Sequence, residues 1–100
     1  MSPAVAPIPP WALKEILSLH GFIVIAEDEY NWSLVEKAQN DSEPIILPKI
    51  GDLVAIDVMM QTLIDAKLNL GAYFALKERV LGKNWGYPAA PTQNAQGRAN

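Results

Sequence analysis

The chain contains no cysteine and a single histidine, His20, among its 100 residues. The lack of cysteine excludes disulfide bonds, thiolate nucleophiles and thiolate metal sites. One imidazole cannot form a histidine-based metal site. His20 also precedes Gly21 at the predicted end of a helix, where a structural or surface role is expected. The sequence therefore predicts no catalytic residue, no metal site and no cofactor.

Other features that accompany catalysis or membranes are missing too. There is no glycine-rich phosphate loop, and no serine has a neighbouring base that would make it a nucleophile. The longest apolar stretches are far shorter than a membrane span, and Met1 to Pro10 carries no basic residue and no long apolar run. We expect a soluble cytoplasmic protein without a signal peptide and without membrane contact.

Charge is present in moderate amount and is unevenly distributed. Half of the residues are hydrophobic, 19% are charged and the net charge is −3, which is typical of one globular domain. Residues 1–43 carry seven acids and two bases, whereas residues 44–100 carry four acids and six bases. The acidity belongs to the first half, and no general attraction to a nucleic-acid backbone is expected.

The N-terminal part predicts an arm, a helix and a first strand. Residues 1–9 contain three prolines and are expected to form an extended arm, poorly ordered or laid on the surface. Pro10 suits the first position of a helix that Gly21 ends, and Trp11 is expected in its buried stripe. Phe22 to Ala26 is an apolar, β-branched run typical of a strand buried on both faces.

Two further strands are predicted after an acidic turn at Glu27 to Glu29. Tyr30 to Lys37 alternates between two faces, as a strand does. A second turn over 38–43 leads to a third strand at Pro44 to Leu47. Its bracketing prolines, Pro44 and Pro48, favour an edge of the sheet.

The C-terminal half predicts two helices and a tail. Asp52 is the expected N-cap of the first helix, whose many apolar positions should make it the most buried one. Asn69 ends this helix and can cap the next, which Gly82 closes. Residues 83–100 are rich in Gly, Pro, Ala, Asn and Gln, so we expect a flexible tail, and we expect its residues beyond about Gly86 to be dispensable for folding. The apolar stripe of the first helix comprises Leu53, Ile56, Met60, Leu63 and Ile64, widened by Val54, Val58 and Met59.

Together these elements predict an α+β fold. The order is helix, three antiparallel strands, helix, helix, and the short turns force the strands into a meander. The helices must cover one face of the sheet, which gives a two-layer sandwich. Residues 10–82 form this single domain.

This order resembles the fold of HicA-type toxins, small relatives of the double-stranded-RNA-binding domain. The similar stretch runs from about Leu13 to Phe74. HicA-type ribonucleases use a histidine in a Gly-Ser-His segment on the second strand, where this chain has Asp28 to Ser33 and no histidine. The resemblance therefore implies the scaffold and excludes the activity. It is carried by Leu17, Leu19, His20, Gly21, Phe22, Pro48, Leu63, Ile64, Ala66, Leu68, Tyr73 and Phe74.

The stretch from Glu27 to Glu43 holds six of the eleven acids and one base, Lys37. Carboxylates at this density imitate a phosphate backbone and steer association with a Lys/Arg-lined groove. An ordinary solvated turn explains the same cluster without a partner, and adjacent carboxylates lack the spacing of a calcium loop. The candidate partner-binding residues are Glu27, Asp28, Glu29, Tyr30, Asn31, Trp32, Glu36, Asp41 and Glu43.

Three functions are compatible with this pattern. The first is a non-enzymatic inhibitor whose acidic hairpin occupies a basic nucleic-acid-binding surface of a partner protein, as in several small phage and anti-CRISPR proteins. The second is a HicA-like mRNA interferase toxin, or its inactive relative, in a toxin–antitoxin pair. The third is a subunit of an oligomer that pairs through an exposed sheet edge or helix. Under the first, the protein makes no direct contact with nucleic acid, and Asp57 and Asp65 serve solubility alone.

Overall fold

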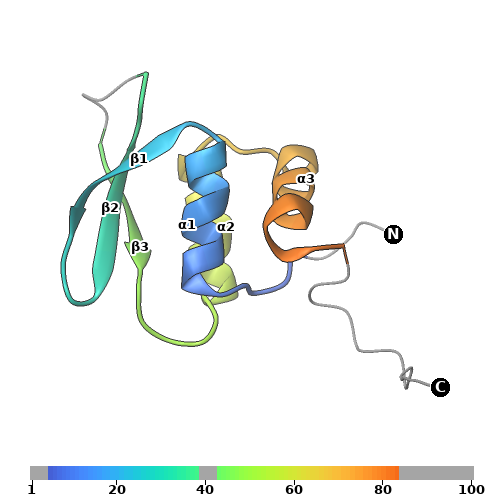
Figure 1. Ribbon diagram of the computed structural model, residues 1–100, viewed down its shortest axis with the longest axis horizontal. Coiled ribbons are helices and arrows are strands. Elements are labelled where there is room, and N and C mark those ends of the chain that lie inside the picture. Colours follow the sequence, from blue (N-terminus) through green and yellow to red (C-terminus); the bar gives the residue numbers. More distant parts are fainter. Residues whose placement is uncertain (1–4, 39–42, 84–100) are drawn as a thin grey trace.

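The computed structural model describes residues 5–38 and 43–83. The strands form one antiparallel sheet in the order β1-β2-β3, and the helices lie on one side of it (Figure 1). The predicted α+β class and the predicted order of elements are confirmed. The elements are α1 (Pro10–Leu19), β1 (Phe22–Glu27), β2 (Asn31–Glu36), β3 (Ile45–Pro48), α2 (Ile56–Asp65) and α3 (Leu70–Leu81).

The three helices lie at different distances from the sheet. α1 and α2 pack directly on the sheet, whereas α3 packs against α1 on the side away from the strands (Figure 1). The core fills the space between the sheet and α1 and continues toward α3, where Tyr73 is fully buried. The two-layer sandwich thus carries one further helix behind it. The largest fully buried side chains are Tyr73, Ile8, Leu13, Ile16, Leu17, Leu34, Leu47 and Met59.

The described part of the N-terminal arm belongs to this core. Ile8 is 0% exposed, and the backbone N–H of Val54 donates to the carbonyl oxygen of Ile8 at 2.8 Å. Val5 packs partly against the same cluster. The expectation of an arm on the surface is therefore wrong for Ile8, because an apolar side chain in an extended segment can fill a core position as well as a helical one. Met1 to Ala4 lie outside the described residues.

Helix α1 begins at Pro10 and is followed by Gly21 at φ +103°, as predicted. The prediction that Trp11 is buried is wrong, because its side chain is largely exposed. Successive helical residues turn by about 100°, so Trp11 lies roughly opposite Leu13, which sits at the centre of the buried face. The buried residues of this helix are Pro10, Ala12, Leu13, Ile16 and Leu17.

Strand β1 lies at an edge of the sheet, and only its first residue, Phe22, is buried. The prediction of a strand buried on both faces is wrong for a topological reason. Within residues 5–38 and 43–83, one edge of β1 has no neighbouring strand and no helix covers the outer face of the sheet (Figure 1). An irregularity in the pairing with β2, between Val24 and Ala26, places Ile25 at a β-bulge.

Strand β3 forms the other edge, as its prolines predict. The backbone N–H of Lys49 donates to the carbonyl oxygen of Tyr30 at 2.8 Å. Backbone N–H and C=O groups alternate in direction along a strand. Those of residues 45, 47 and 49 therefore point toward β2, while the backbone groups of Pro44, Ile46 and Pro48 point away from β2, toward the open edge. Proline has no N–H, which leaves Ile46 as the one outward donor among these three positions.

Helix α2 is less buried than predicted. Its buried residues are Met59, Thr62 and Leu63, while three residues of the predicted stripe are exposed. The reason is that α2 rests on β3 along one narrow face, and α3 packs on α1 instead of covering α2. Ala55, without a side-chain hydrogen bond, occupies the N-cap position that Asp52 was expected to fill. The exposed stripe residues are Ile56, Met60 and Ile64.

Helix α2 ends in a backbone motif that sequence patterns do not mark. Lys67 adopts φ +55°, its N–H donates to Ile64 at 3.1 Å, and the N–H of Leu68 donates to Leu63 at 3.0 Å. These two bonds form a Schellman motif. Asn69 is then free to cap α3, and its Oδ1 accepts the N–H of Ala72 at 2.8 Å, as predicted. Of the predicted tail over 83–100, all but Lys83 lies outside the described residues.

Candidate protein-binding site

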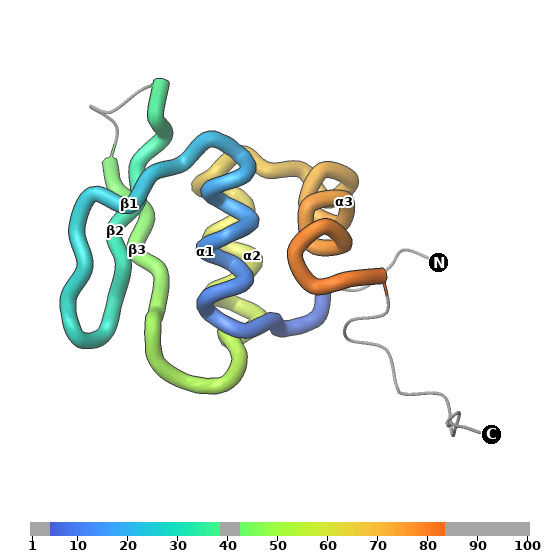
Figure 2. Tube along the Cα trace, in the orientation of Figure 1, coloured from blue at the N-terminus to red at the C-terminus, as the bar shows by residue number. Residues whose placement is uncertain are grey.

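The acidic residues predicted to form one surface lie at two ends of a hairpin. Glu27, Asp28 and Glu29 lie at the turn between β1 and β2, while Glu36 and Glu43 flank the other end of β2. Figure 2 shows this turn and the other end of the hairpin at opposite ends of the sheet. The six residues of β2 separate these ends by about 20 Å. Asp41 lies outside the described residues. The structure therefore divides the candidate surface into parts with different surroundings.

Asp28 holds the turn together. Its Oδ1 accepts the backbone N–H groups of Tyr30 and Asn31, each at 2.8 Å. These bonds make an Asx turn, in which a carboxylate replaces a backbone acceptor. They also lower the pKa of Asp28, because both bonds favour the ionised carboxylate. Asp28 is thus already engaged within the chain.

Glu27 is engaged as well. Its Oε2 lies 2.6 Å from Nζ of Lys49, and the same ammonium donates to the backbone oxygen of Asp28 at 2.8 Å. The hydrogen bond from Lys49, followed by its positive charge, lowers the pKa of Glu27. Lys49 was not singled out from the sequence, although it follows β3 directly and pairs with Tyr30 through its backbone. All four residues from Glu27 to Tyr30 are exposed, and the side chains of Glu29 and Tyr30 take no part in these bonds.

We predict that Asp28→Ala lowers the melting temperature by a few degrees at neutral pH, because two backbone donors lose their acceptor. Asp28→Asn keeps an acceptor oxygen at that position and is expected to retain most of the stability. The lowered pKa means that the contribution of ionised Asp28 is present above its ordinary pKa of 3.8 and is lost as pH falls through the lowered value. Thermal unfolding monitored by circular dichroism from pH 7 into acid measures both effects. Equal melting temperatures for wild type and Asp28→Ala would show that the turn does not need this carboxylate.

The strand residues of the predicted set are less accessible. Asn31, Trp32 and Glu36 are half-buried. Trp32 packs against the core, and Nζ of Lys14 on α1 lies 4.9 Å from the centroid of its ring. That distance fits a cation–π contact. Trp32 therefore serves the packing between α1 and the sheet more than it serves an outer surface.

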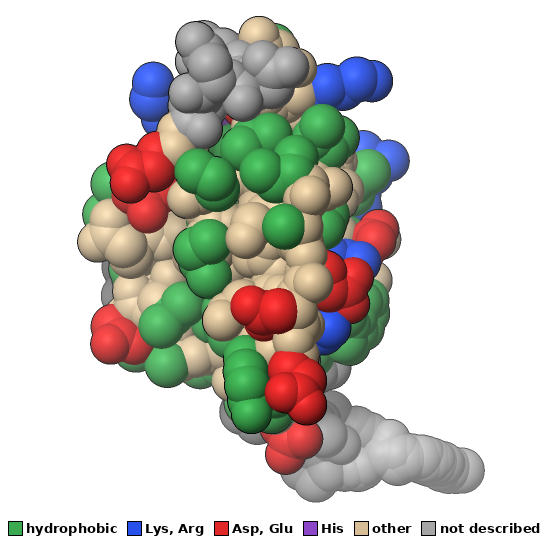
Figure 3. Space-filling view, turned by 90° about the vertical axis from the view of Figure 1, so that its left-hand side faces the viewer, with side chains coloured by type: hydrophobic (Ala, Val, Ile, Leu, Met, Phe, Trp, Pro, Cys, Tyr) green, Lys and Arg blue, Asp and Glu red, His purple; other side chains and the backbone are tan. Residues whose placement is uncertain are grey.

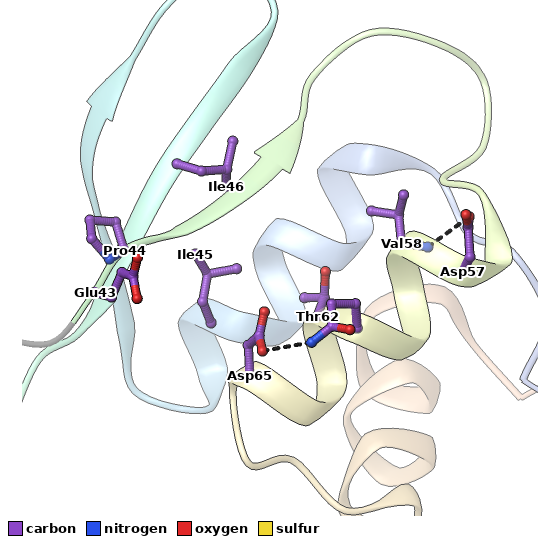
Figure 4. Close-up of a pocket in the computed structure, with 9 residues that line it drawn as sticks. Glu43, Pro44, Ile45, Ile46, Asp57, Val58, Thr62 and Asp65 are labelled. Carbon is purple, nitrogen blue, oxygen red and sulfur yellow. Dashed lines mark hydrogen bonds between the residues drawn. The ribbon is translucent and has the colours of Figure 1, made fainter.

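Glu43 belongs to a second acidic region, a groove between β3 and α2. The groove has a volume of about 810 Å³, and Figure 4 shows strand residues on one side and helix residues on the other. Among the described residues, three carboxylates line it and no lysine or arginine does. Its lining residues are Glu43, Pro44, Ile45, Ile46, Asp57, Val58, Gln61, Thr62 and Asp65.

Two of these carboxylates come from the exposed side of α2. Asp57 and Asp65 were expected to act only as solubilising charges, and they do lie on the exposed side of the helix. Asp57 accepts its neighbouring backbone N–H from Val58 at 2.9 Å, and Asp65 accepts from Nε2 of Gln61 at 2.9 Å. The sequence contained a usable signal, because Asp57, Gln61 and Asp65 follow each other at four-residue intervals, which places them on one helix face.

The outer face of the sheet lies next to this groove through Ile46, which is exposed. Figure 3 views the side of the molecule that no helix covers. Hydrophobic side chains are spread over its centre and upper part, and acidic side chains lie toward its sides and lower part. The groove therefore adjoins an apolar surface with acidic groups at its margins.

Other kinds of site find little support in the described part of the chain. No three His, Asp or Glu side chains there are arranged to hold a metal ion. The ring of His20 stacks on that of Phe22, with centroids 6.1 Å apart, which suits the structural role expected for it. None of the described helices has the length and apolar character needed to cross a lipid bilayer.

Comparisons with known proteins add no identification. The sequence matches no protein-family model, and searches among curated proteins and among solved structures found no match.

Proposed function

We propose that the chain is a non-enzymatic cytoplasmic protein that binds a basic surface of a partner protein, of the kind that otherwise holds RNA or DNA. The observation that carries the proposal is the β3–α2 groove, whose lining in the described part of the chain has three carboxylates and no base. A concave surface with one sign of charge raises the local concentration of the opposite charge and steers its approach.

The spacing of the carboxylates suits an elongated basic segment. Asp57 and Asp65 are eight residues apart on α2, which corresponds to about 12 Å along the helix axis. Glu43 lies on the strand side, and apolar Ile45 and Val58 lie between the charges. A partner segment that alternates basic and apolar side chains would place ammonium or guanidinium groups on the carboxylates and its apolar groups between them.

The position of Asp65 supports a role in binding rather than in folding. It is the last residue of α2, and a carboxylate at that end of a helix is opposed by the helix dipole. Its one described hydrogen bond, from Gln61, is exposed. A lysine would suit the helix better at this position. A residue that costs stability where it stands is a reasonable candidate for a contact outside the chain.

The turn between β1 and β2 would supply a second, smaller contact. The side chains of Glu29 and Tyr30 there are exposed and take no part in the described bonds that hold Glu27 and Asp28. Occupation of a basic surface by both regions would exclude a nucleic acid from it. Inhibition would then follow from competition, without any chemical step.

The test uses a fluorescent peptide in which arginine and lysine alternate with leucine, and a double variant, Glu43→Lys with Asp65→Lys. We expect the double variant to weaken binding by about tenfold or more, mainly through a slower association rate. Added salt should weaken wild-type binding in the same direction. The melting temperature should not fall, because Asp65→Lys removes a charge that opposes the helix dipole.

The matched control is Glu15→Lys with Glu78→Lys, which changes the net charge equally at exposed positions on α1 and α3. This control should retain most of the binding. Equal losses in both double variants would mean that only net charge matters, and the groove would lose its assignment. Displacement of a labelled DNA oligonucleotide from the same peptide by wild-type protein tests the proposed competition with nucleic acid.

A second candidate is an inactive HicA-like relative in a toxin–antitoxin pair. It is favoured by the order α1-β1-β2-β3-α2 with both helices against one side of the sheet, which is the scaffold that the resemblance implies. Where those ribonucleases carry a histidine, β2 begins with Asn31, Trp32 and Ser33, all half-buried. Cleavage of RNA by wild type that is lost in His20→Ala would favour an active enzyme over both candidates.

A further inference from the structure

Strand β1 has an unpaired edge made of apolar residues. Ile23, Val24 and Ile25 are 41%, 39% and 53% exposed, although they belong to an uncharged run from Phe22 to Ala26. No backbone hydrogen bond outside the sheet involves residues 22–27 in the described part of the chain. A β-branched, uncharged edge strand without proline is the kind that pairs with another strand.

The direction of the backbone groups along β1 follows from one hydrogen bond. The N–H of Lys37 donates to the carbonyl oxygen of Gly21 at 2.9 Å, so Gly21 faces β2. By alternation the backbone N–H and C=O groups of Ile23 also point toward β2. Those of Phe22 and Val24 point away from β2, toward the open edge of the sheet. This edge therefore offers two complete donor and acceptor pairs before the bulge at Ile25.

We propose that β1 pairs antiparallel with β1 of a second copy of this chain, about a two-fold axis at Ile23. In this register, Phe22 of each copy forms a hydrogen-bonded pair with Val24 of the other. Ile23 lies opposite Ile23 of the second copy on the outer face of the sheet. The two three-stranded sheets become one of six strands, and the apolar areas of the two outer faces join.

The choice of a second copy rests on self-complementarity and on charge. The run from Phe22 to Ala26 offers a foreign strand no charged group for recognition, whereas two such runs match each other about a two-fold axis. Antiparallel pairing also places the acidic turn of one copy, at Glu27 to Glu29, at the opposite end of the joined strands from that of the other. Parallel pairing would bring the two acidic turns together.

The same structure explains why the assembly would stop at two copies. At the β3 edge, Pro44 and Pro48 occupy two of the three outward positions and provide no N–H. Each copy thus has one sheet edge that can pair with another strand, the edge of β1. In the dimer this edge is occupied, so no third copy can add to it. The bulge at Ile25 further limits the contact to the first part of β1.

Val24→Pro tests the proposal directly, because it removes an outward N–H that the single chain does not use. This substitution removes a hydrogen-bond donor from the open edge of β1, as Pro44 and Pro48 do at the edge of β3. Ile23→Lys is the second variant, since it places two like charges opposite each other at the axis while leaving the backbone intact. The control is Ile46→Lys, which makes the same change at another exposed isoleucine of the sheet, on β3.

Sedimentation velocity over a wide concentration range measures the outcome. We expect a dimer for wild type and for Ile46→Lys, and a monomer for Val24→Pro and Ile23→Lys, with folding checked by circular dichroism. If Val24→Pro fails to fold, Ile23→Lys alone decides. A wild type that stays monomeric at high micromolar concentration, a dimer that survives in Ile23→Lys, or growth beyond two copies would each overturn the proposal. Dimerisation should change little with added salt, which separates it from binding of the basic peptide.

Discussion

Replacing Ile8 with alanine is expected to lower the free energy of unfolding by about 2–5 kcal/mol. Ile8 is 0% exposed and belongs to the core cluster, and the backbone of the same residue accepts a hydrogen bond from Val54. Truncation to alanine removes buried methyl groups and leaves a cavity that the surrounding helices cannot fill completely. Urea unfolding monitored by tryptophan fluorescence measures the change.

The matched control is Ile50→Ala, which makes the same substitution at an exposed position between β3 and α2. A surface change of this kind usually shifts the unfolding free energy by less than about 0.5 kcal/mol. Similar effects at the two positions would show that the arm is not anchored in the core in solution. A large difference would identify residues before α1 as part of the folded domain.

The second large effect concerns Tyr73 in alkaline solution. Its side chain is fully buried, and its hydroxyl has no hydrogen-bond partner among the described residues. Burial raises the pKa of Tyr73 to about 12, against an ordinary value of 10.0, because the interior disfavours the charged phenolate. The folded state therefore holds this proton more tightly than the unfolded state does.

The sign of the pH dependence follows from that difference. Below pH 10 both states keep the proton, and the group adds no dependence on pH. As pH rises from 10 toward 12, only the unfolded state loses the proton, so the folded state becomes less stable by about 2–3 kcal/mol. Tyr73→Phe should abolish this loss and, at neutral pH, should raise stability by about 1 kcal/mol, since an unpaired polar group leaves the core.

Tyr30→Phe is the control, because it removes the same hydroxyl from an exposed tyrosine. Urea unfolding at pH 8 and near pH 11 should give parallel losses for wild type and Tyr30→Phe, and a smaller loss for Tyr73→Phe. Parallel losses in all three proteins would mean that the Tyr73 hydroxyl reaches water or a partner in solution.

The order of elements could be predicted because local signals mark it. Pro10 and Gly21 bound the first helix, Pro44 precedes the edge strand β3 and Pro48 ends it, and Asn69 caps the last helix. Each of these residues acts through its own backbone geometry or through a neighbour in sequence. Such effects do not depend on how the elements later pack.

Burial could not be predicted in the same way. The run from Phe22 to Ala26 has the composition of a central strand, but in the part of the chain that the structure describes β1 has a neighbouring strand on one side only. Ile56, Met60 and Ile64 follow a helical stripe, but α3 packs on α1 and leaves them exposed. Hydrophobicity along a segment measures what it can bury, whereas topology decides what covers it.

The candidate site depended even more on packing. The groove joins Glu43 to Asp57 and Asp65 across the contact between β3 and α2, and nothing in the local sequence fixes that contact. The role of Asp28 was easier to predict from the sequence. An aspartate at the start of a tight turn commonly accepts hydrogen bonds from the backbone N–H groups of the residues that follow it.

The hydrogen bond between Ile8 and Val54 bears on the order in which a newly made chain acquires its structure. Ile8 leaves the ribosome early, together with α1, whereas Val54 follows only after the whole sheet has been made. At about 5–20 residues per second, the arm waits a few seconds for its partner. During that interval the β1–β2 hairpin can close, but Ile8 has no core to enter. The segment around Ile8 is therefore made before the sheet but protected only after it, and a chain stalled before Val54 would expose this segment to chaperones and proteases.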